Sequence, residues 1–328
     1  MKNQILKMTI LFTLTTCCHW SCDKENQDGS EKTKWTIFDV SDGLISNPVY
    51  SIAVESENII WIGTNRGVSK LDGTTWTSYE DHGLANHIVS AIAIDKLGNK
   101  WFGTLGNGVV KFENNNNWIT YDESNGLADN RVNEIIIDES NTIWFGTDKG
   151  VSKFDGLTWT TYTTSDGLVE NHVFSIAIDN TGNFWFGTNG GVSKFNGATW
   201  TSYIYNGDKN KGIAGNGVMS IVVDNSGSKW FGTWGGLSEF NGTNWTNHLE
   251  TEWLKAGSIA NSIIVDSSGI VWFGSNGWGI SKLNGKIWTT YTIANQSEIA
   301  SVNAIATDSK GTMWFGTVAG ILKLEFIK

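Results

Sequence analysis

The feature that most constrains this chain is a tetrapeptide that returns seven times. Trp-(Ile/Phe)-Gly-(Thr/Ser) begins at Trp61, Trp101, Trp144, Trp185, Trp230, Trp272 and Trp314, at intervals of 40 to 45 residues. A repeat of about 42 residues is typical of propeller blades, each of which holds four strands. The period therefore predicts an all-β fold, a seven-bladed β-propeller with four antiparallel strands in each blade.

Each copy contains the signals of the same four strands. An acidic residue stands six positions before every repeat tryptophan, and Gly or Asn follows it after three positions. Because Gly and Asn accept the positive φ of a tight hairpin, this pattern indicates a turn between an inner strand a and a strand b that carries the tetrapeptide. Strand c reads Gly-Val-Ser-Lys-Phe in two copies, and strand d reads Trp-Thr-x-Tyr in most. We interpret the acids as structural turn residues: Glu55, Asp95, Asp138, Asp179, Asp224, Asp266 and Asp308.

The chain starts out of phase with its own repeat. Residues 34–38 contain a strand d with no preceding a, b or c, whereas the last copy stops after its strand c. Residues 34–38 are therefore expected to complete the seventh blade and close the ring, so that no unpaired edge remains there. The propeller domain predicted in this way spans residues 34–328.

The first residues resemble a bacterial lipoprotein signal. Lys2 and Lys7 precede an uncharged segment that ends before Cys22, and the chain then turns polar. At about 14 residues this segment is too short for a membrane span. We expect a signal peptide at 1–21, a lipidated Cys22 with a flexible tether over 22–33, and a cell-envelope lipoprotein at the outer membrane, surface-facing or periplasmic. Cys17, preceded by Leu14, is the alternative lipidation site, and a plain secretory signal is a third interpretation.

Composition excludes several classes of function. The chain has 33 acidic and 23 basic residues, for a net charge of −10, which disfavours nucleic-acid binding. Its three cysteines all lie in the first 22 residues, and no His-x-x-x-His pair occurs, so neither a disulfide framework nor a metal site is expected in the propeller. No cofactor is expected, and we predict a monomer that contacts the membrane only through its lipid.

The repeat resembles that of the two-component regulator propeller family, whose units carry Asp-x-x-Gly-x-x-Trp-Phe-Gly-Thr followed by Gly-Val-x-Lys-Phe. The resemblance covers residues 35 to 325. It implies an extracytoplasmic sensing propeller of a kind that often precedes a histidine kinase and is associated with polysaccharide uptake. Since this chain ends at residue 328 without a kinase domain, we carry over the fold and a binding role, and not the signalling.

Three tryptophans of the expected propeller fall outside the repeat positions: Trp234, Trp253 and Trp278. In a propeller, the d–a and b–c loops open on one face, and all three residues belong to such loops in blades five and six. The longest d–a connection, 204–217, adds Tyr205 to that face. Clustered aromatic rings indicate a ligand surface, and stacking on sugar rings is its natural use. Packing of long loops onto the body is the alternative.

A second candidate site follows from the position eight residues before each turn acid, where strand a begins beside the channel. It holds Asn47, His87, Asn130, Asn171 and Asn216, and Arg131 and His172 come directly after two of them. Asn at a strand entry is also a common turn former, so a structural role is the alternative.

These patterns predict an extracytoplasmic binding or sensing propeller, with a carbohydrate as its ligand. The alternatives are a scaffold for an envelope protein and a propeller lyase or hydrolase that uses His87 or His172 as its base. The nearest enzyme that the repeat resembles is a streptogramin lyase, whose blades carry Trp-Phe-Thr. Because no histidine has an obvious acidic partner in the sequence, we expect no enzyme.

Overall fold

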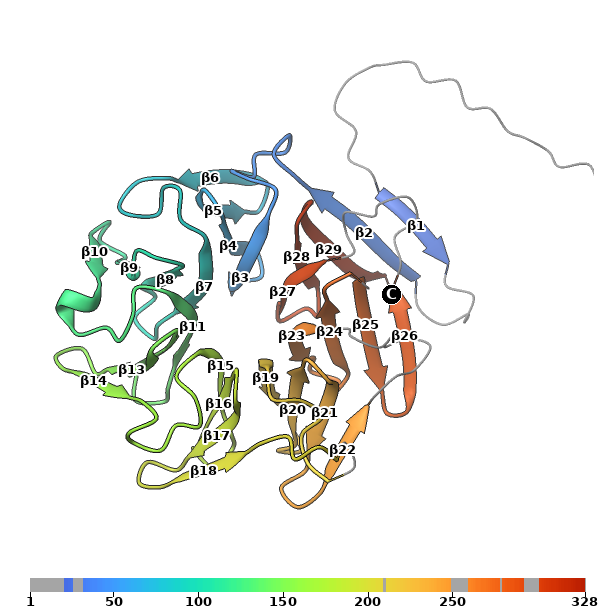
Figure 1. The fold of residues 1–328 in the computed structure, drawn as a ribbon. Helices are drawn as coiled ribbons and strands as arrows, with labels where there is room; N and C mark the ends of the chain where they lie inside the picture. Colours follow the sequence, from blue (N-terminus) through green and yellow to red (C-terminus); the bar gives the residue numbers. More distant parts are fainter. Residues whose placement is uncertain are drawn as a thin grey trace, which may run out of the picture.

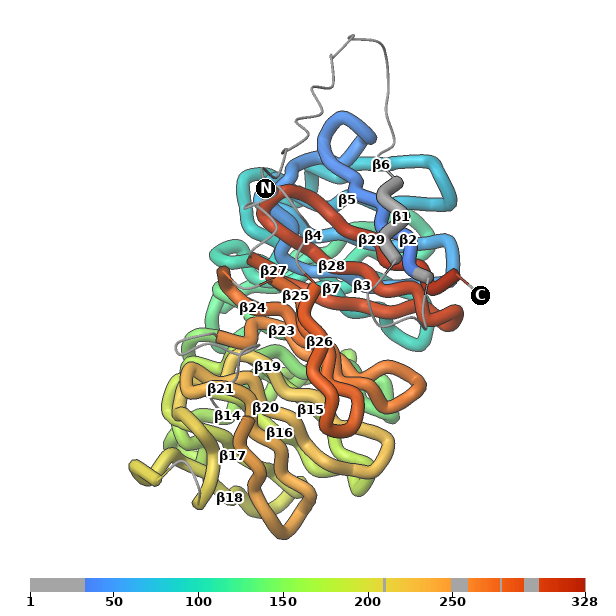
Figure 2. Tube along the Cα trace, turned by 90° about the vertical axis from the view of Figure 1, so that its right-hand side faces the viewer, coloured from blue at the N-terminus to red at the C-terminus, as the bar shows by residue number. Residues whose placement is uncertain are grey.

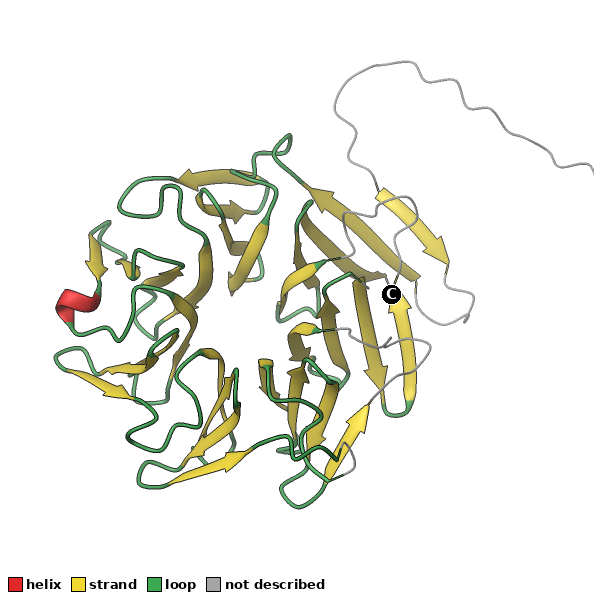
Figure 3. Cartoon of the chain, in the orientation of Figure 1, coloured by secondary structure: helices red, strands yellow, loops and turns green. Residues whose placement is uncertain are grey.

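The strands form blades around a central axis, as Figure 1 shows. The computed structural model describes residues 21–25, 32–208, 211–248, 259–277, 279–291 and 301–327, with the backbone alone at 21–25 and at Lys32. Within these residues there are seven antiparallel sheets, and the only helix is the short 3-10 turn η1 (Glu123–Asn125), visible in Figure 3. None of the described segments is a long apolar helix of the kind that spans a bilayer. The predicted seven-bladed propeller is confirmed.

The blades follow one another along the chain, each running from the channel outward. The strands of blades one to three are β3 (Val49–Ser56), β4 (Ile59–Thr64), β5 (Gly67–Asp72) and β6 (Thr75–Tyr79); β7 (Val89–Ile94), β8 (Lys100–Thr104), β9 (Val109–Phe112) and β10 (Trp118–Tyr121); and β11 (Val132–Ile137), β12 (Ile143–Thr147), β13 (Gly150–Phe154) and β14 (Trp159–Tyr162). Those of blades four to six are β15 (Val173–Ile178), β16 (Phe184–Thr188), β17 (Gly191–Phe195) and β18 (Trp200–Tyr203); β19 (Val218–Val223), β20 (Lys229–Thr233), β21 (Gly236–Phe240) and β22 (Trp245–His248); and β23 (Ala260–Val265), β24 (Val271–Ser275), β25 (Gly279–Asn284) and β26 (Ile287–Tyr291).

Blade seven is built from both ends of the chain. It contains β27 (Val302–Thr307), β28 (Met313–Thr317), β29 (Gly320–Ile327) and, as its outer strand, β2 (Lys32–Phe38). Both views place β2 beside β29 (Figures 1 and 2), with Trp35 opposite Leu324. Trp35 is only 9% exposed and contacts Tyr291 and Phe315, at centroid distances of 5.6 and 5.9 Å. The expected ring closure is confirmed.

The backbone of β1 (Ser21–Glu25) pairs with the outer edge of β2, with Cys22 opposite Trp35. The outer edge of β2 presents unpaired N–H and C=O groups, which is why a further segment can add there. The start of the expected tether is thus a paired strand. Residues 1–20, with Cys17, and residues 26–31 lie outside the described residues, so the signal peptide and the flexible tether stay predictions.

The fixed spacing of six residues between acid and tryptophan has a direct cause. In blades one to six the indole Nε1 donates to the carboxylate at 2.7–3.1 Å, while the backbone N–H groups of the turn donate to its other oxygen in most blades. The pKa of Asp179 falls well below its usual range because hydrogen bonds from Thr181, Asn183 and Trp185 outweigh the opposing effect of burial. The interpretation of the acids as structural residues is confirmed.

The glycine of the tetrapeptide sets the distance between blades. A Cβ atom at Gly187 would lie 2.8 Å from the carbonyl oxygen of Val218, and one at Gly232 would lie 2.4 Å from that of Ala260. In both cases the neighbouring atom belongs to the innermost strand of the next blade. Only a residue without a side chain lets the two blades approach so closely.

Every innermost strand has a β-bulge at the same point, five residues before the turn acid. A bulge redirects side chains, so the residues four and five positions before the acid both face the channel. At least one of the two joins each blade to the next, and in blade six both do. Five of these side chains donate to a backbone carbonyl of the next blade: Ser51 to Val89 O, Ser90 to Val132 O, Asn133 to Val173 O, Asn261 to Val302 O and Asn303 to Val49 O. Three serine hydroxyls accept from a backbone N–H of the next blade: Ser175 from Ile221, Ser220 from Ile263 and Ser262 from Ile305.

Candidate ligand-binding face and channel

Trp234 lies on the face formed by the d–a and b–c loops, directly after β20. Its indole rests on Gly217, where an added Cβ would lie 2.3 Å from the ring, and the backbone N–H of Trp234 donates to Gly217 O at 2.9 Å. The side chain is nevertheless 51% exposed. Trp253 and Trp278 lie outside the described residues, so the aromatic cluster stays a prediction. Tyr205 is partly buried against the core between blades four and five, which favours the packing alternative for that residue.

The asparagines that precede the innermost strands, a ring of residues around the channel, hold the d–a loops in place. The side-chain oxygens of Asn47, Asn130, Asn171 and Asn216 accept from the N–H groups of Val40, Glu123, Thr164 and Tyr205, at 2.9, 3.0, 2.9 and 2.6 Å. Each bond fixes the start of the preceding d–a loop, as the turn-former alternative predicts. His87, the member of the ring in blade two, lies near Gly106 of the b–c loop. A ligand role for the ring stays a prediction, but none of these residues lines the channel cavity.

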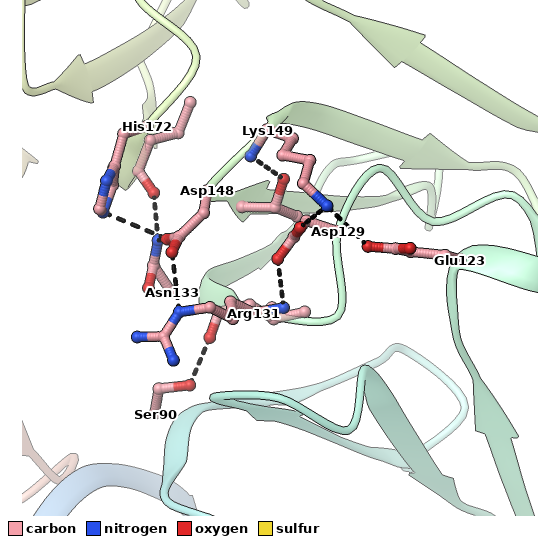
Figure 4. Close-up of polar contacts among 11 residues, drawn as sticks. Ser90, Glu123, Asp129, Arg131, Asn133, Asp148, Lys149 and His172 are labelled. Atoms are coloured by element: carbon pink, nitrogen blue, oxygen red, sulfur yellow. Dashed lines mark hydrogen bonds and ion pairs between the residues drawn. The ribbon is translucent and has the colours of Figure 1, made fainter.

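Asp148 gathers three side chains at the rim of the channel, as Figure 4 shows. One carboxylate oxygen accepts from Arg131 Nε at 2.8 Å, and the other accepts from Asn133 Nδ2 at 2.8 Å. His172 Nε2 lies 3.2 Å from that second oxygen. The expectation that no histidine has an acidic partner is therefore wrong. Asp148 is in the b–c loop of blade three and His172 precedes strand a of blade four, so the pair forms only when the blades pack together.

Lys149, beside Asp148 in the same loop, is paired on the outer side of this rim. Its ammonium lies 3.0 Å from Glu123 and also contacts Asp129 (Figure 4). Burial favours a higher pKa for Asp129, but hydrogen bonds from Lys149 and from the Arg131 N–H outweigh it and lower that pKa. The hydrogen bonds that Lys149 donates to Asp129 and Glu123 in turn raise the pKa of Lys149. The Lys149 ammonium thus pairs with Glu123 and Asp129 and not with Asp148. The side chains beside the Asp148 carboxylate are therefore Arg131, Asn133 and His172.

The channel itself contains an open cavity of about 360 Å³. Its wall is formed by the residues at the seven bulges, and Glu134 is the one carboxylate among the described residues that line it. Burial raises the pKa of Glu134 to about 7, and its carboxylate accepts a bond from the N–H of Ile135 at 3.3 Å. Asn133 connects this cavity to the rim, because it lines the wall and donates to Asp148.

Sequence reasoning missed both acids. Asp148 directly follows the tetrapeptide, at the position that Trp234 occupies in blade five; the other blades carry Asn65, Leu105, Asn189, Asn276 and Val318 there. Glu134 stands where the other blades carry Ser51, Ala91, Ser175, Ser220, Ser262 and Ala304. At each of these two repeat positions only one blade carries an acid, and that departure from the repeat is the signal that could have found both residues. Across the residues the structure describes, no three His, Cys, Asp or Glu side chains group so as to hold a metal ion.

Comparison with known proteins gives the family of the repeat. Residues 43–66, 126–149, 167–190 and 298–319 match the model of the two component regulator propeller. The chain carries two component regulator propeller repeats. The resemblance found in the sequence is thereby confirmed. The matched repeat 126–149 includes Asp148. A search of curated proteins finds no match.

Solved structures share the fold of these propeller repeats. The extracellular domain of BT3049 from B. thetaiotaomicron, described as a hybrid two component system, is 24% identical with a TM-score of 0.75, over 93% of this chain and 44% of that one. Virginiamycin B lyase from Staphylococcus aureus, an inactive variant with quinupristin, is 18% identical with a TM-score of 0.73, and the match covers 90% of this chain and 100% of that one. PorZ, a surface component of the type-IX secretion system of Porphyromonas gingivalis, is 18% identical with a TM-score of 0.69, and the match covers 87% of this chain and 47% of that one. This chain thus spans less than half of BT3049 and of PorZ.

Proposed function

We propose that this propeller is an extracytoplasmic binding or sensing module, and not an enzyme, that recognises a carbohydrate on the face of its d–a and b–c loops. The observation that carries the proposal is Trp234, a half-exposed indole held on Gly217. The extracellular location of the BT3049 domain, which has the same fold, supports the location.

The chemistry of this face suits a neutral polar ligand. An indole stacks on the C–H face of a sugar ring, while side chains beside it can bond the hydroxyl groups. Arg131 directs its terminal guanidinium nitrogens away from Asp148 (Figure 4), and the rim also offers the imidazole of His172. An envelope protein is the alternative ligand, for which the same face would serve as a docking surface.

Replacement of Trp234 by Ala should weaken binding of a glycan identified on an array by up to about tenfold. The reason is the loss of stacking worth about 0.5–1.5 kcal/mol, at about 1.4 kcal/mol per decade of affinity. Val318→Ala is the matched control, because Val318 is an exposed apolar residue at the same repeat position in blade seven. Calorimetric titration measures both variants, and circular dichroism checks their folding. Equal affinity of the Trp234→Ala variant and the parent would place the ligand elsewhere.

Catalysis is the second candidate function, and the His172–Asp148 pair favours it. A carboxylate beside an imidazole orients it and supports proton transfer, and virginiamycin B lyase shares the fold. The two functions differ in one measurement, the appearance of unsaturated or reducing ends when the protein is incubated with polysaccharides. Turnover that His172→Ala abolishes would overturn the binding-only proposal.

We further propose that lipid on Cys22 anchors the protein at the outer membrane. The uncharged segment before Cys22 and the polar residues after it support this proposal. Expression of the full chain should give a membrane-bound product whose mass includes acyl groups, and Cys22→Ala should release it into the soluble fraction. A Cys22→Ala protein that stays membrane-bound, with lipid on Cys17, would contradict the assignment.

A further inference from the structure

The carboxylate of Glu134 has no structural task that its position explains. In the other blades the two bulge residues supply the bond that joins neighbouring blades, and Ser51, Ser175, Ser220 and Ser262 do so from the position equivalent to Glu134. In blade three Asn133 makes that bond to Val173 instead. The bond that Glu134 accepts comes from Ile135, the next residue in its own strand.

The surroundings of Glu134 supply no positive charge. The described residues that line the cavity from β3, β7, β15, β19, β23 and β27 include no Lys, Arg or His, and Tyr50 is the only other titratable side chain among them. At the rim, Arg131 and His172 are both engaged with Asp148. A partly buried carboxylate without a counter-ion is costly, and a bound cation would offset that cost.

The wall around Glu134 also indicates which cation would fit. Hydroxyl and amide oxygens of Ser and Asn side chains can accept hydrogen bonds, and the rings of Tyr50 and Phe174, with Met219, offer contacts for a short aliphatic stem. A divalent metal ion would meet one carboxylate, too few charged ligands for a dedicated site. We propose that the channel is a second binding site, independent of the carbohydrate face, for a small primary ammonium compound whose cationic head pairs with Glu134.

Binding of n-butylammonium chloride to the intact propeller tests this site. Saturation-transfer NMR and calorimetry at pH 8 should show saturable binding, and Glu134→Gln should weaken it at least tenfold. Glu239→Gln is the matched control, because burial also raises the pKa of Glu239, a carboxylate in β21 that does not line the cavity. This control should bind like the parent. Tetramethylammonium, which has a charge and no N–H donor, should bind more weakly.

The pH dependence gives an independent check. With a pKa of about 7, the carboxylate is about one-tenth ionised at pH 6 and nine-tenths at pH 8, so affinity should rise roughly ninefold between them. The raised pKa also means that the folded state holds a proton that the unfolded state releases, and stability falls from about pH 4.5 to 7. The Glu134→Gln variant has no carboxyl group to ionise at this position, so it does not lose stability over this pH range. It should melt roughly 2–6 °C above the parent at pH 8 and level with it at pH 4.5.

Three outcomes would overturn the proposal. They are the absence of saturable binding by the parent, equal binding by the Glu134→Gln variant, and a response to MgCl₂ that equals the response to the ammonium probe and depends in the same way on Glu134. Failure of this site leaves the carbohydrate proposal standing, because Trp234 lies outside the cavity.

Discussion

A propeller that begins at Asp39 should melt at least about 10 °C below one that begins at Lys32. The shorter chain lacks β2, whose seven residues pair with β29. It also lacks Trp35, and removal of a buried Trp side chain costs about 3–5 kcal/mol. In addition, β29 becomes an open edge that can pair with another molecule. Calorimetry measures the melting temperature, and light scattering measures self-association.

Both truncated chains lack β1, so the comparison isolates β2. The chain that begins at Lys32 should remain monomeric and melt close to a chain that keeps Ser21–Glu25. Equal melting temperatures for the Lys32 and Asp39 chains would show that β2 contributes nothing to ring closure.

Substitution of Gly232 by Ala is expected to lower the free energy of unfolding by about 3 kcal/mol. The new Cβ would lie 2.4 Å from Ala260 O and 3.0 Å from Ala260 Cβ, so the innermost strand of blade six would have to move away. Forced overpacking of this kind costs about 1–3 kcal/mol and occasionally more. Chemical denaturation followed by tryptophan fluorescence measures the change.

Gly242→Ala separates packing from backbone strain. Gly242 has a φ of +98°, and no atom lies within 4 Å of a Cβ built there. Its replacement should cost only the left-handed backbone penalty of about 1 kcal/mol. If Gly232→Ala destabilises the protein no more than Gly242→Ala does, the close approach of the blades is not what requires glycine in the tetrapeptide.

The fold was predictable because its determinants recur. The period, the invariant distance from acid to tryptophan and the surplus strand around Trp35 are each visible without knowing what touches what. The reasons behind them were not visible. The indole-to-carboxylate bond and the contact at Gly232 exist only between paired strands or adjacent blades.

The candidate site was predictable only in part. Arg131 and His172 were expected near the opening and the structure brings both to Asp148, but the link between them crosses from one blade to the next. Glu134 was hidden for a different reason. The bulge that turns both Asn133 and Glu134 to the channel leaves no mark in the sequence.

The pairing of β2 with β29 has a consequence for how the protein is made. Each of blades one to six is contiguous in the chain, so its hairpins can form as soon as its own residues are free to fold. The partner of β2 follows about 280 residues later, so it becomes available only after nearly all of the other strands. Until then Trp35 has no core to enter. The pairing of β2 with β29 spans the greatest sequence separation of any strand pair in the propeller, the kind of contact that forms most slowly, and until it forms β2 is exposed to chaperones and proteases.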